Sequence, residues 1–268
     1  MDKNAPIGIF DSGTGGLTVA QAVKKLLPRE DMIYFGDTAH LPYGDKSATT
    51  IQSYSIKITN ALLERGCKAI LIACNSASAA AFELVKEYVG SRALVVNVVD
   101  PVVDYVGKNH LHHKVGLIGT LQTVNSKVFE MKLNGKGADV NLAPLATPLL
   151  VPMIEEGFIH DKISHEIIAK YLTDDQLKDI SALILGCTHY PIIKSDIKEF
   201  YKDSVELIDS ANIVAQSLKQ QLENLDLLTD VNDGHDQFLV SDFTPAFEKA
   251  AGLFFNKEIH LEKYPLWE

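Results

Sequence analysis

Two of the three cysteines occupy equivalent places in the sequence, and their thiols are the residues best suited to acid/base chemistry. Cys74 ends the apolar run AILIAC and precedes NSAS, and Cys187 ends ALILGC and precedes TH. A single free cysteine is usually a small buried hydrophobe, which is our interpretation of Cys67. A matched pair at strand ends, close to helix N-termini that lower a thiol pKa, instead predicts a functional pair.

Asp11 is a further candidate for chemistry, in the glycine-rich stretch DSGTGG at 11–16. The stretch lacks the lysine of a P-loop, and Thr18 stands where the dinucleotide fingerprint needs its third glycine. A carboxylate here would repel a phosphate but would suit an ammonium group or a proton-transfer role. The alternative is that Asp11 only caps the following helix.

His189 lies two residues after Cys187, where it could assist the thiol electrostatically or as a proton partner. A zinc site is disfavoured, because Cys-x-His is tight for two ligands of one ion and no C-x-x-C or H-E-x-x-H motif supplies others. We interpret HLHH at 110–113 as a solvated loop. Glu155 and Glu156 are interpreted as a solvated helix end rather than as part of a cleft.

The loop HLPYGDK at 40–46 lies between a strand and a helix, which is a common place for a binding loop, although a surface turn explains it equally well. The chain has only three arginines, and none lies within these motifs. A carboxylate ligand would therefore be held by backbone N–H groups at helix starts and by hydroxyl groups. The candidate hydroxyls are those of Ser12, Ser76, Thr120 and Thr188.

The elements that must position these residues alternate between apolar runs of strand length and helical patterns. Strand-like runs lie at 7–10, 32–35, 69–73, 93–99, 115–119, 182–186 and 205–208. One helix is predicted to open at Ser47 and close at Gly66. Since the runs are apolar on both faces, they predict parallel sheets covered on both sides in an α/β fold.

The two halves of the chain also look like copies of one α/β unit. Each half begins with a strand and a polar loop, IGIFDSGTGG or VGLIGTLQT, and reaches its strand-end cysteine after a similar length of chain. Ligands of open α/β sheets bind beyond the carboxyl ends of the strands, so two facing units would place both thiols in one cleft. Thiols on two sides of a substrate suit redox chemistry or two-sided proton transfer. The second explains the duplication, since near-symmetric half-sites fit a substrate and product that are mirror images.

Composition narrows the class of protein. The 268 residues are 46% hydrophobic, as expected for a core-forming globular chain. The formal charge of −10 has no compensating basic stretch, which argues against nucleic acid or an anionic membrane as the main partner and favours a small molecule. The apolar stretch in the N-terminal MDKNAPIGIF is shorter than the apolar region of a signal peptide, and no apolar run is long enough to span a membrane. We therefore expect a cytoplasmic protein with reduced thiols.

Four motifs together resemble the glutamate racemases of bacterial cell-wall synthesis, in the aspartate/glutamate racemase superfamily. They are DSGTGG at 11–16, PYG at 42–44, ACNSAS at 73–78 and LGCTHYP at 185–191. Ser76 stands where the family commonly has threonine, which keeps the hydroxyl group. The resemblance implies two similar α/β domains related by pseudo-twofold symmetry, 1–98 plus 209–268 and 99–208, with the active site in the cleft between them.

The same resemblance implies an isomerase that interconverts L- and D-glutamate for peptidoglycan synthesis, without pyridoxal phosphate or metal. Cys74 and Cys187 would be the acid/base residues on opposite faces of the α-carbon, assisted by Asp11 and His189. The partner would be the small-molecule substrate and, as one option, a second copy of the chain. The implied substrate-binding residues are Asp11, Ser12, Pro42, Tyr43, Gly44, Asn75, Ser76, Thr120, Thr188 and His189.

Three other interpretations stay open at this point. An aspartate racemase would share both cysteines and would be distinguished by comparing the turnover of the two acids. A dithiol oxidoreductase would form a Cys74–Cys187 disulfide under mild oxidant. A non-catalytic binding module would bind glutamate without exchanging its α-proton.

Overall fold

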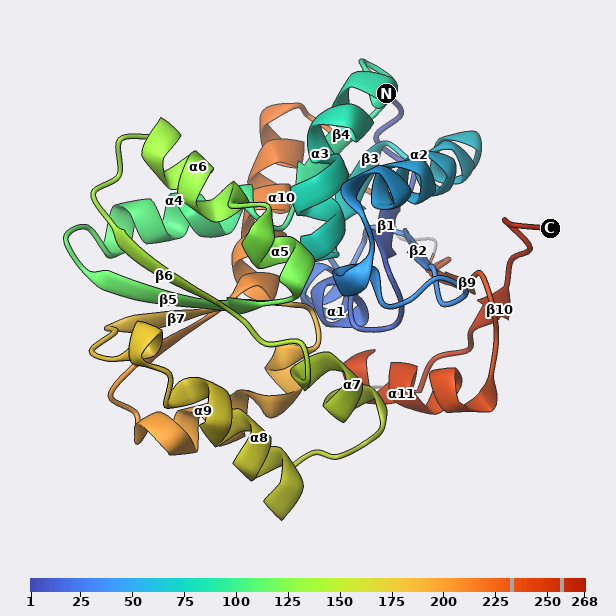
Figure 1. Cartoon of the computed structure of the whole chain (residues 1–268). Helices are drawn as coiled ribbons and strands as arrows, with labels where there is room; N and C mark the ends of the chain where they lie inside the picture. The colour runs from blue at the N-terminus through green and yellow to red at the C-terminus, as the bar shows by residue number, and fades with distance from the viewer. Residues whose placement is uncertain (232–233, 256–257) are drawn as a thin grey trace.

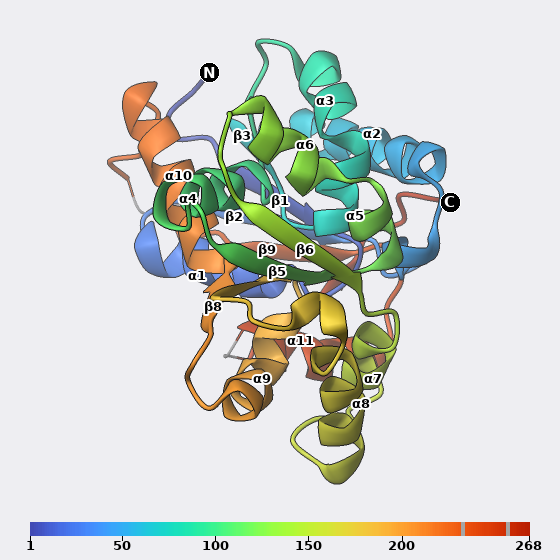
Figure 2. The same ribbon diagram turned by 60° about the vertical axis from the view of Figure 1, so that its left-hand side comes forward.

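The computed structural model describes residues 1–231, 234–255 and 258–268, and it contains two β-sheets flanked by helices (Figure 1 and Figure 2). The larger sheet consists of β1 (Ile7–Asp11), β2 (Met32–Gly36), β3 (Ala69–Ile72), β4 (Leu94–Asn97), β9 (Gln237–Val240) and β10 (Glu262–Lys263). The smaller sheet consists of β5 (Lys114–Gly119), β6 (Asn141–Ala146), β7 (Ala182–Gly186) and β8 (Glu206–Asp209). Every strand pairing between described residues is parallel, as the apolar runs predict.

The two sheets repeat one topology. The strand orders are β10-β9-β2-β1-β3-β4 and β6-β5-β7-β8, so β2, β1, β3 and β4 correspond to β6, β5, β7 and β8. The duplication inferred from the sequence is therefore present in the fold, and β3 and β7, which precede the two matched cysteines, hold equivalent places. The molecule consists of two α/β domains with parallel sheets; the domain boundaries at 98/99 and 208/209 stay a prediction.

Helices connect the strands and cover the sheets (Figure 1). In the first half they are α1 (Leu17–Leu26), η1 (Tyr43–Asp45), α2 (Ala48–Glu64), α3 (Asn75–Val89) and α4 (Asp100–Asn109). They continue with α5 (Leu121–Asn125), α6 (Val128–Gly135), α7 (Leu150–Glu155), α8 (Lys162–Leu172), η2 (Asp175–Leu177), η3 (Tyr190–Ile193), α9 (Lys194–Tyr201), α10 (Ser210–Asn224) and α11 (Pro245–Phe255). The predicted start of α2 is confirmed, because Ser47 caps it through the N–H of Thr50.

The largest hydrophobic cluster joins the two halves. It includes Ile9 of β1, Leu183 of β7 and Val214 of α10, all buried. Helix α10 follows the last strand of the smaller sheet and packs against both α1 and α4. The chain then returns to the larger sheet, where β9 pairs with β2. Over the described ranges, no helix is both long and apolar enough to cross a membrane.

Candidate active site

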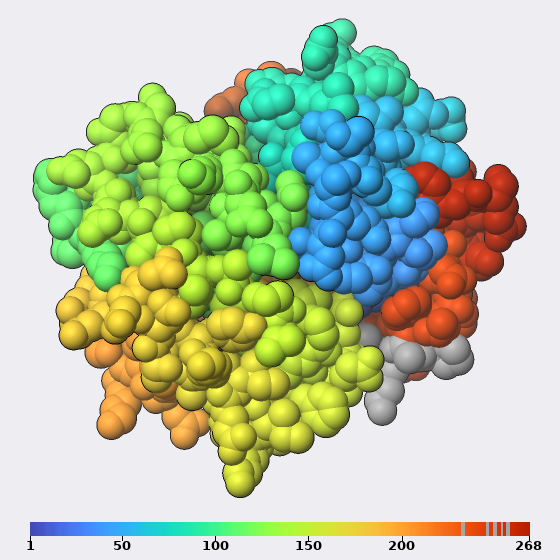
Figure 3. Space-filling view, viewed as in Figure 1, coloured from blue at the N-terminus to red at the C-terminus, as the bar shows by residue number. Residues whose placement is uncertain are grey.

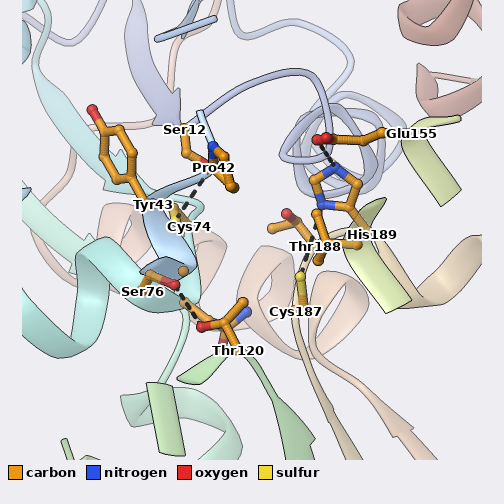
Figure 4. Close-up of a pocket in the computed structure, with 13 residues that line it drawn as sticks. Ser12, Pro42, Tyr43, Cys74, Ser76, Thr120, Glu155, Cys187, Thr188 and His189 are labelled. Atoms are coloured by element: carbon orange, nitrogen blue, oxygen red, sulfur yellow. Dashed lines mark hydrogen bonds and ion pairs between the residues drawn. The ribbon is translucent and has the colours of Figure 1, made fainter. Parts of the chain in front are cut away.

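Side chains from both domains line one pocket at the carboxyl ends of the strands (Figure 4). Cys74 follows β3 and Cys187 follows β7, and Figure 4 shows the two side chains projecting from different elements into the same space. On the face drawn in Figure 3, residues of the two domains meet along a seam. The lining residues are Ser12, Pro42, Tyr43, Gly44, Cys74, Asn75, Ser76, Thr120, Val151, Glu155, Cys187, Thr188 and His189.

The Cys74 thiol lies at the N-cap of α3 and is 5% exposed. Its Sγ accepts the N–H of Ala77 at 3.4 Å and donates to Ser12 Oγ at 3.8 Å. Burial, and then the negative charge of Asp11, raise the pKa of Cys74 to about 12 in spite of these contacts. The N–H group at the helix start does lower the pKa of this thiol, as expected, but desolvation and Asp11 outweigh it, so the net change is a rise.

The Cys187 thiol has a different neighbour. Its Sγ lies 3.8 Å from Nδ1 of His189, and Nε2 of His189 lies 3.0 Å from Oε1 of Glu155. Burial by itself lowers the pKa of His189, but the hydrogen bonds and charges of Cys187 and Glu155 outweigh burial and raise it to about 10. His189 is consequently an imidazolium at neutral pH, and it places a positive charge beside the sulfur of Cys187.

Glu155 is part of the site, which corrects its interpretation as a solvated helix end. Both Glu155 and its neighbour Glu156 are exposed, but Glu155, which ends α7, pairs with His189 and lines the pocket. The sequence contains a signal for this, because Glu155 lies four residues after Val151 and therefore on the same helix face. Val151 lines the pocket as well.

Asp11 is fully buried at the end of β1 and is not among the residues that line the pocket. Its Oδ2 accepts the N–H groups of Gly13 at 3.1 Å and Gly16 at 3.0 Å, both in the loop before α1, and no side chain caps that helix, so the capping alternative is wrong. Burial raises the pKa of Asp11, against the opposing effect of His189 and the N–H donors. Its second oxygen, Oδ1, has no hydrogen-bond partner among the described residues.

The glycines of DSGTGG are required for close packing in the site. A Cβ on Gly15 would lie 2.6 Å from Nδ1 of His189, and a Cβ on Gly16 would lie 2.5 Å from Cβ of Asp11. Only glycine allows the loop to approach these two side chains so closely. The motif therefore packs the first domain against the histidine of the second.

Two further contacts cross between the domains. Ser76 Oγ and Thr120 Oγ1 are 2.9 Å apart, and Thr120 is also the N-cap of α5. A Cβ on Gly44 would lie 2.8 Å from Cβ of Thr120, so the loop at 42–44 packs directly on this threonine. The hydroxyl of Tyr43 donates to Asp37 at 2.6 Å and is thereby engaged away from a ligand.

Other residues singled out from the sequence lie elsewhere. Cys67 is 3% exposed in the core of the first domain, which confirms its structural interpretation. In HLHH, His112 and His113 are exposed, but His110 is 7% exposed, so the solvated-loop interpretation is wrong for that histidine. Within the part of the chain that the structure describes, no group of three or more His, Cys, Asp or Glu side chains is arranged to hold a metal ion.

Comparisons with known proteins agree with this geometry. The family model for Asp/Glu/hydantoin racemases matches residues 15–218. A glutamate racemase of Persephonella marina is 40% identical over 260 residues, which is 97% of each chain. The crystal structure of glutamate racemase from Francisella tularensis in complex with D-glutamate superposes with a TM-score of 0.92 at 37% identity, covering 99% of both chains. The Thermus thermophilus glutamate racemase, in complex with beta-chloro-D-alanine, gives a TM-score of 0.87 at 39% identity and 98% coverage of both chains.

Proposed function

The chain belongs to the Asp/Glu/hydantoin racemase family, and we propose that this isomerase racemises glutamate without a cofactor, by two-sided proton transfer between thiols. The observation that carries the proposal is the placement of Cys74 and Cys187, which follow equivalent strands of the two sheets and line one pocket. The product D-glutamate would serve peptidoglycan synthesis in the cytoplasm.

We assign the two thiols different roles at the start of a turnover. Cys74 keeps its proton, because its pKa of about 12 lies far above neutral pH. Cys187 Sγ lies 3.8 Å from Nδ1 of the His189 imidazolium, so we assign the role of the charged base to Cys187. One protonated acid and one charged base are what a two-base reaction requires before each turnover.

In the first step, the Cys187 thiolate forms an S–H bond as the C–H bond at the α-carbon breaks. The electron pair left on the α-carbon delocalises into the α-carboxylate. The Cys74 thiol then delivers its proton to the opposite face and becomes a thiolate, so one proton is taken, one is given and the configuration is inverted. The reverse reaction starts from the Cys74 thiolate with Cys187 protonated.

The polar lining supports binding of an amino acid. Asn75 lines the pocket, and its Nδ2 is buried without a partner among the described residues, so an acceptor group of a ligand would satisfy it. None of the described residues that line the pocket is Lys or Arg, so neutral donors must hold the carboxylates. We assign this role to the hydroxyls of Ser12, Ser76, Thr120 and Thr188, and to backbone N–H groups at the starts of α3 and α5.

Circular dichroism of L-glutamate incubated with metal-free, pyridoxal-free protein tests the proposal. The wild type should bring the signal to zero, and L-aspartate should turn over far more slowly. Since an acid or base typically contributes a factor of about 100 to 10,000, Cys74→Ala and Cys187→Ala should each lose at least about 100-fold in rate. Cys67→Ala is the matched control and should retain activity. Racemisation by either active-site variant at the wild-type rate would contradict the assignment.

A further inference from the structure

Asp37 is a buried carboxylate that the proposed proton transfers do not use. It directly follows β2 and is fully buried. Its Oδ1 accepts from Ser241 Oγ at 2.7 Å and from Trp267 Nε1 at 2.8 Å. Its Oδ2 accepts from the hydroxyl of Tyr43 at 2.6 Å, and Nδ1 of His40 lies 3.1 Å from both oxygens.

These contacts join two parts of the chain that are distant in sequence. Tyr43 belongs to the wall of the pocket, between Pro42 and Gly44. Ser241 directly follows β9 and Trp267 is the penultimate residue, 230 positions after Asp37. In Figure 3 the C-terminal residues, drawn in red, lie against the blue and cyan segments of the first domain.

The ring of Trp267 is fixed by its neighbours as well as by its N–H group. Its centroid lies 4.6 Å from that of His40, edge to face at 89°, and 5.2 Å from that of Tyr54. Nζ of Lys57 lies 4.6 Å from the centre of the indole ring. Tyr54 in turn lies 5.7 Å from Tyr43, so the packing of the indole also reaches the loop of the pocket.

Asp37 lies at the centre of this set of contacts and accepts hydrogen bonds from side chains of both parts of the chain. Burial, and then the charge of Asp37, hold the pKa of Tyr43 well above its ordinary value, so its hydroxyl keeps the proton that it donates. A buried carboxylate is stable only when its oxygens are hydrogen-bonded. The C-terminal donors Ser241 and Trp267 therefore help to determine where Asp37 lies, and Asp37 determines where Tyr43 lies.

We propose that the C-terminal segment positions the substrate loop at 42–44, with Trp267 and Ser241 holding Asp37, and Asp37 holding Tyr43. This inference rests on the proposed function, because it assigns the loop to glutamate binding. Trp267 is then a positioning residue: it acts on substrate affinity through Tyr43 and takes no part in proton transfer.

Steady-state kinetics of Trp267→Phe test the inference, because phenylalanine keeps an aromatic ring but lacks the N–H donor. Since a hydrogen bond to a charged group is lost, the KM for glutamate should rise about three- to tenfold in both directions, with kcat within about twofold of the wild type. Ser241→Ala removes the other donor to the same oxygen and should act in the same direction.

Tyr264→Phe is the matched control. Tyr264 belongs to the same C-terminal segment, but its ring packs on Phe35 and Arg65 rather than on the Asp37 contacts. Its KM should equal that of the wild type. If Trp267→Phe and Ser241→Ala unfold more easily but keep wild-type kcat and KM, the segment is only structural and the inference is wrong.

Fluorescence gives a second and independent measurement, because Trp267 is the only tryptophan in the chain. Saturating D-glutamate should change the emission of the wild type, and Tyr43→Phe, which breaks the link to Asp37, should abolish that change. If the tryptophan emission of the wild type does not change when D-glutamate is added, the inference is wrong. If the wild type does not racemise glutamate, the proposed function fails, and this titration decides the inference by itself.

Discussion

The two thiols have similar positions in the backbone but opposite electrostatic surroundings. Cys74 is buried beside the carboxylate of Asp11, which raises its pKa, whereas Cys187 is paired with the imidazolium of His189. These surroundings suit the proposed roles of Cys74 as the acid and Cys187 as the base in a two-base racemisation. The backbone positions of the two cysteines are therefore equivalent, whereas the charges beside their sulfur atoms have opposite signs.

Glu155→Gln tests the charged half of the site. Cys187 and Glu155 together raise the pKa of His189 to about 10 against the effect of burial, so loss of the Glu155 carboxylate should lower that pKa and let the imidazolium deprotonate at lower pH. We therefore expect the basic limb of the pH profile of kcat/KM to move to lower pH. Glu156→Gln, at the exposed neighbouring position, is the control and should leave the limb in place. An unmoved limb in Glu155→Gln would show that this carboxylate does not act through His189.

Candidates for the chemical roles can be proposed from the sequence, and the structure brings three of them, Cys74, Cys187 and His189, to one pocket, but their protonation cannot be predicted in this way. Cys74, Cys187, Asp11 and His189 are marked by their positions at strand ends. The pKa of a thiol depends on how deeply it is buried and on which charge the other domain or loop places beside it, and neither is local in sequence. Glu155 was misinterpreted for the same reason, since its partner His189 lies in a different element.

At the scale of elements, short loops after the strands set the geometry of the site. The loop after β1 supplies Asp11 and packs Gly15 on His189, and the loop after β5 supplies Thr120, which contacts Ser76 and Gly44. These loops have room only because glycine stands at the contacts. The glycine-rich motif that resembles a phosphate loop is explained here by packing.

Gly15→Ala should therefore damage the site while Gly13→Ala should not. A Cβ at Gly15 would overlap His189 at 2.6 Å, whereas the nearest atom to a Cβ at Gly13 is in Leu41 at 3.7 Å, an ordinary contact. Since displacement of a catalytic group by about 1 Å can cost about 100-fold, we expect a loss of kcat/KM of that order in Gly15→Ala. Equal activity of the two variants, measured with circular dichroism, would contradict the packing argument.

The seven strands predicted from apolar runs are all present, whereas β6, β9 and β10 were missed. Strand β6 lies at the edge of its sheet and contains Pro144. An edge strand tolerates proline, but a proline in a sequence argues against a strand, so the pattern does not predict β6. Strand β10 has only two residues. These strands depend on pairing with distant segments, which a local pattern does not contain.

At the scale of the whole molecule, the duplicated sheets and the cleft between them explain why the strand-end cysteine occurs twice. Each α/β unit presents one thiol at the carboxyl end of an equivalent strand, and contacts such as Ser76 with Thr120 hold the units together at the pocket. A reaction between mirror images suits such a pair of half-sites. The central claim is that the two thiols act on opposite faces of one α-carbon.

Racemisation of L-glutamate in D₂O, followed by chiral separation and mass analysis at low conversion, tests this claim most directly. If each face has its own thiol, the proton removed from one face stays on that sulfur while a solvent deuteron arrives from the other thiol. The D-glutamate formed should then carry deuterium at the α-carbon, and the recovered L-glutamate should carry little. Substantial protium at the α-carbon of the D-glutamate would show that one base serves both faces, and would contradict the account.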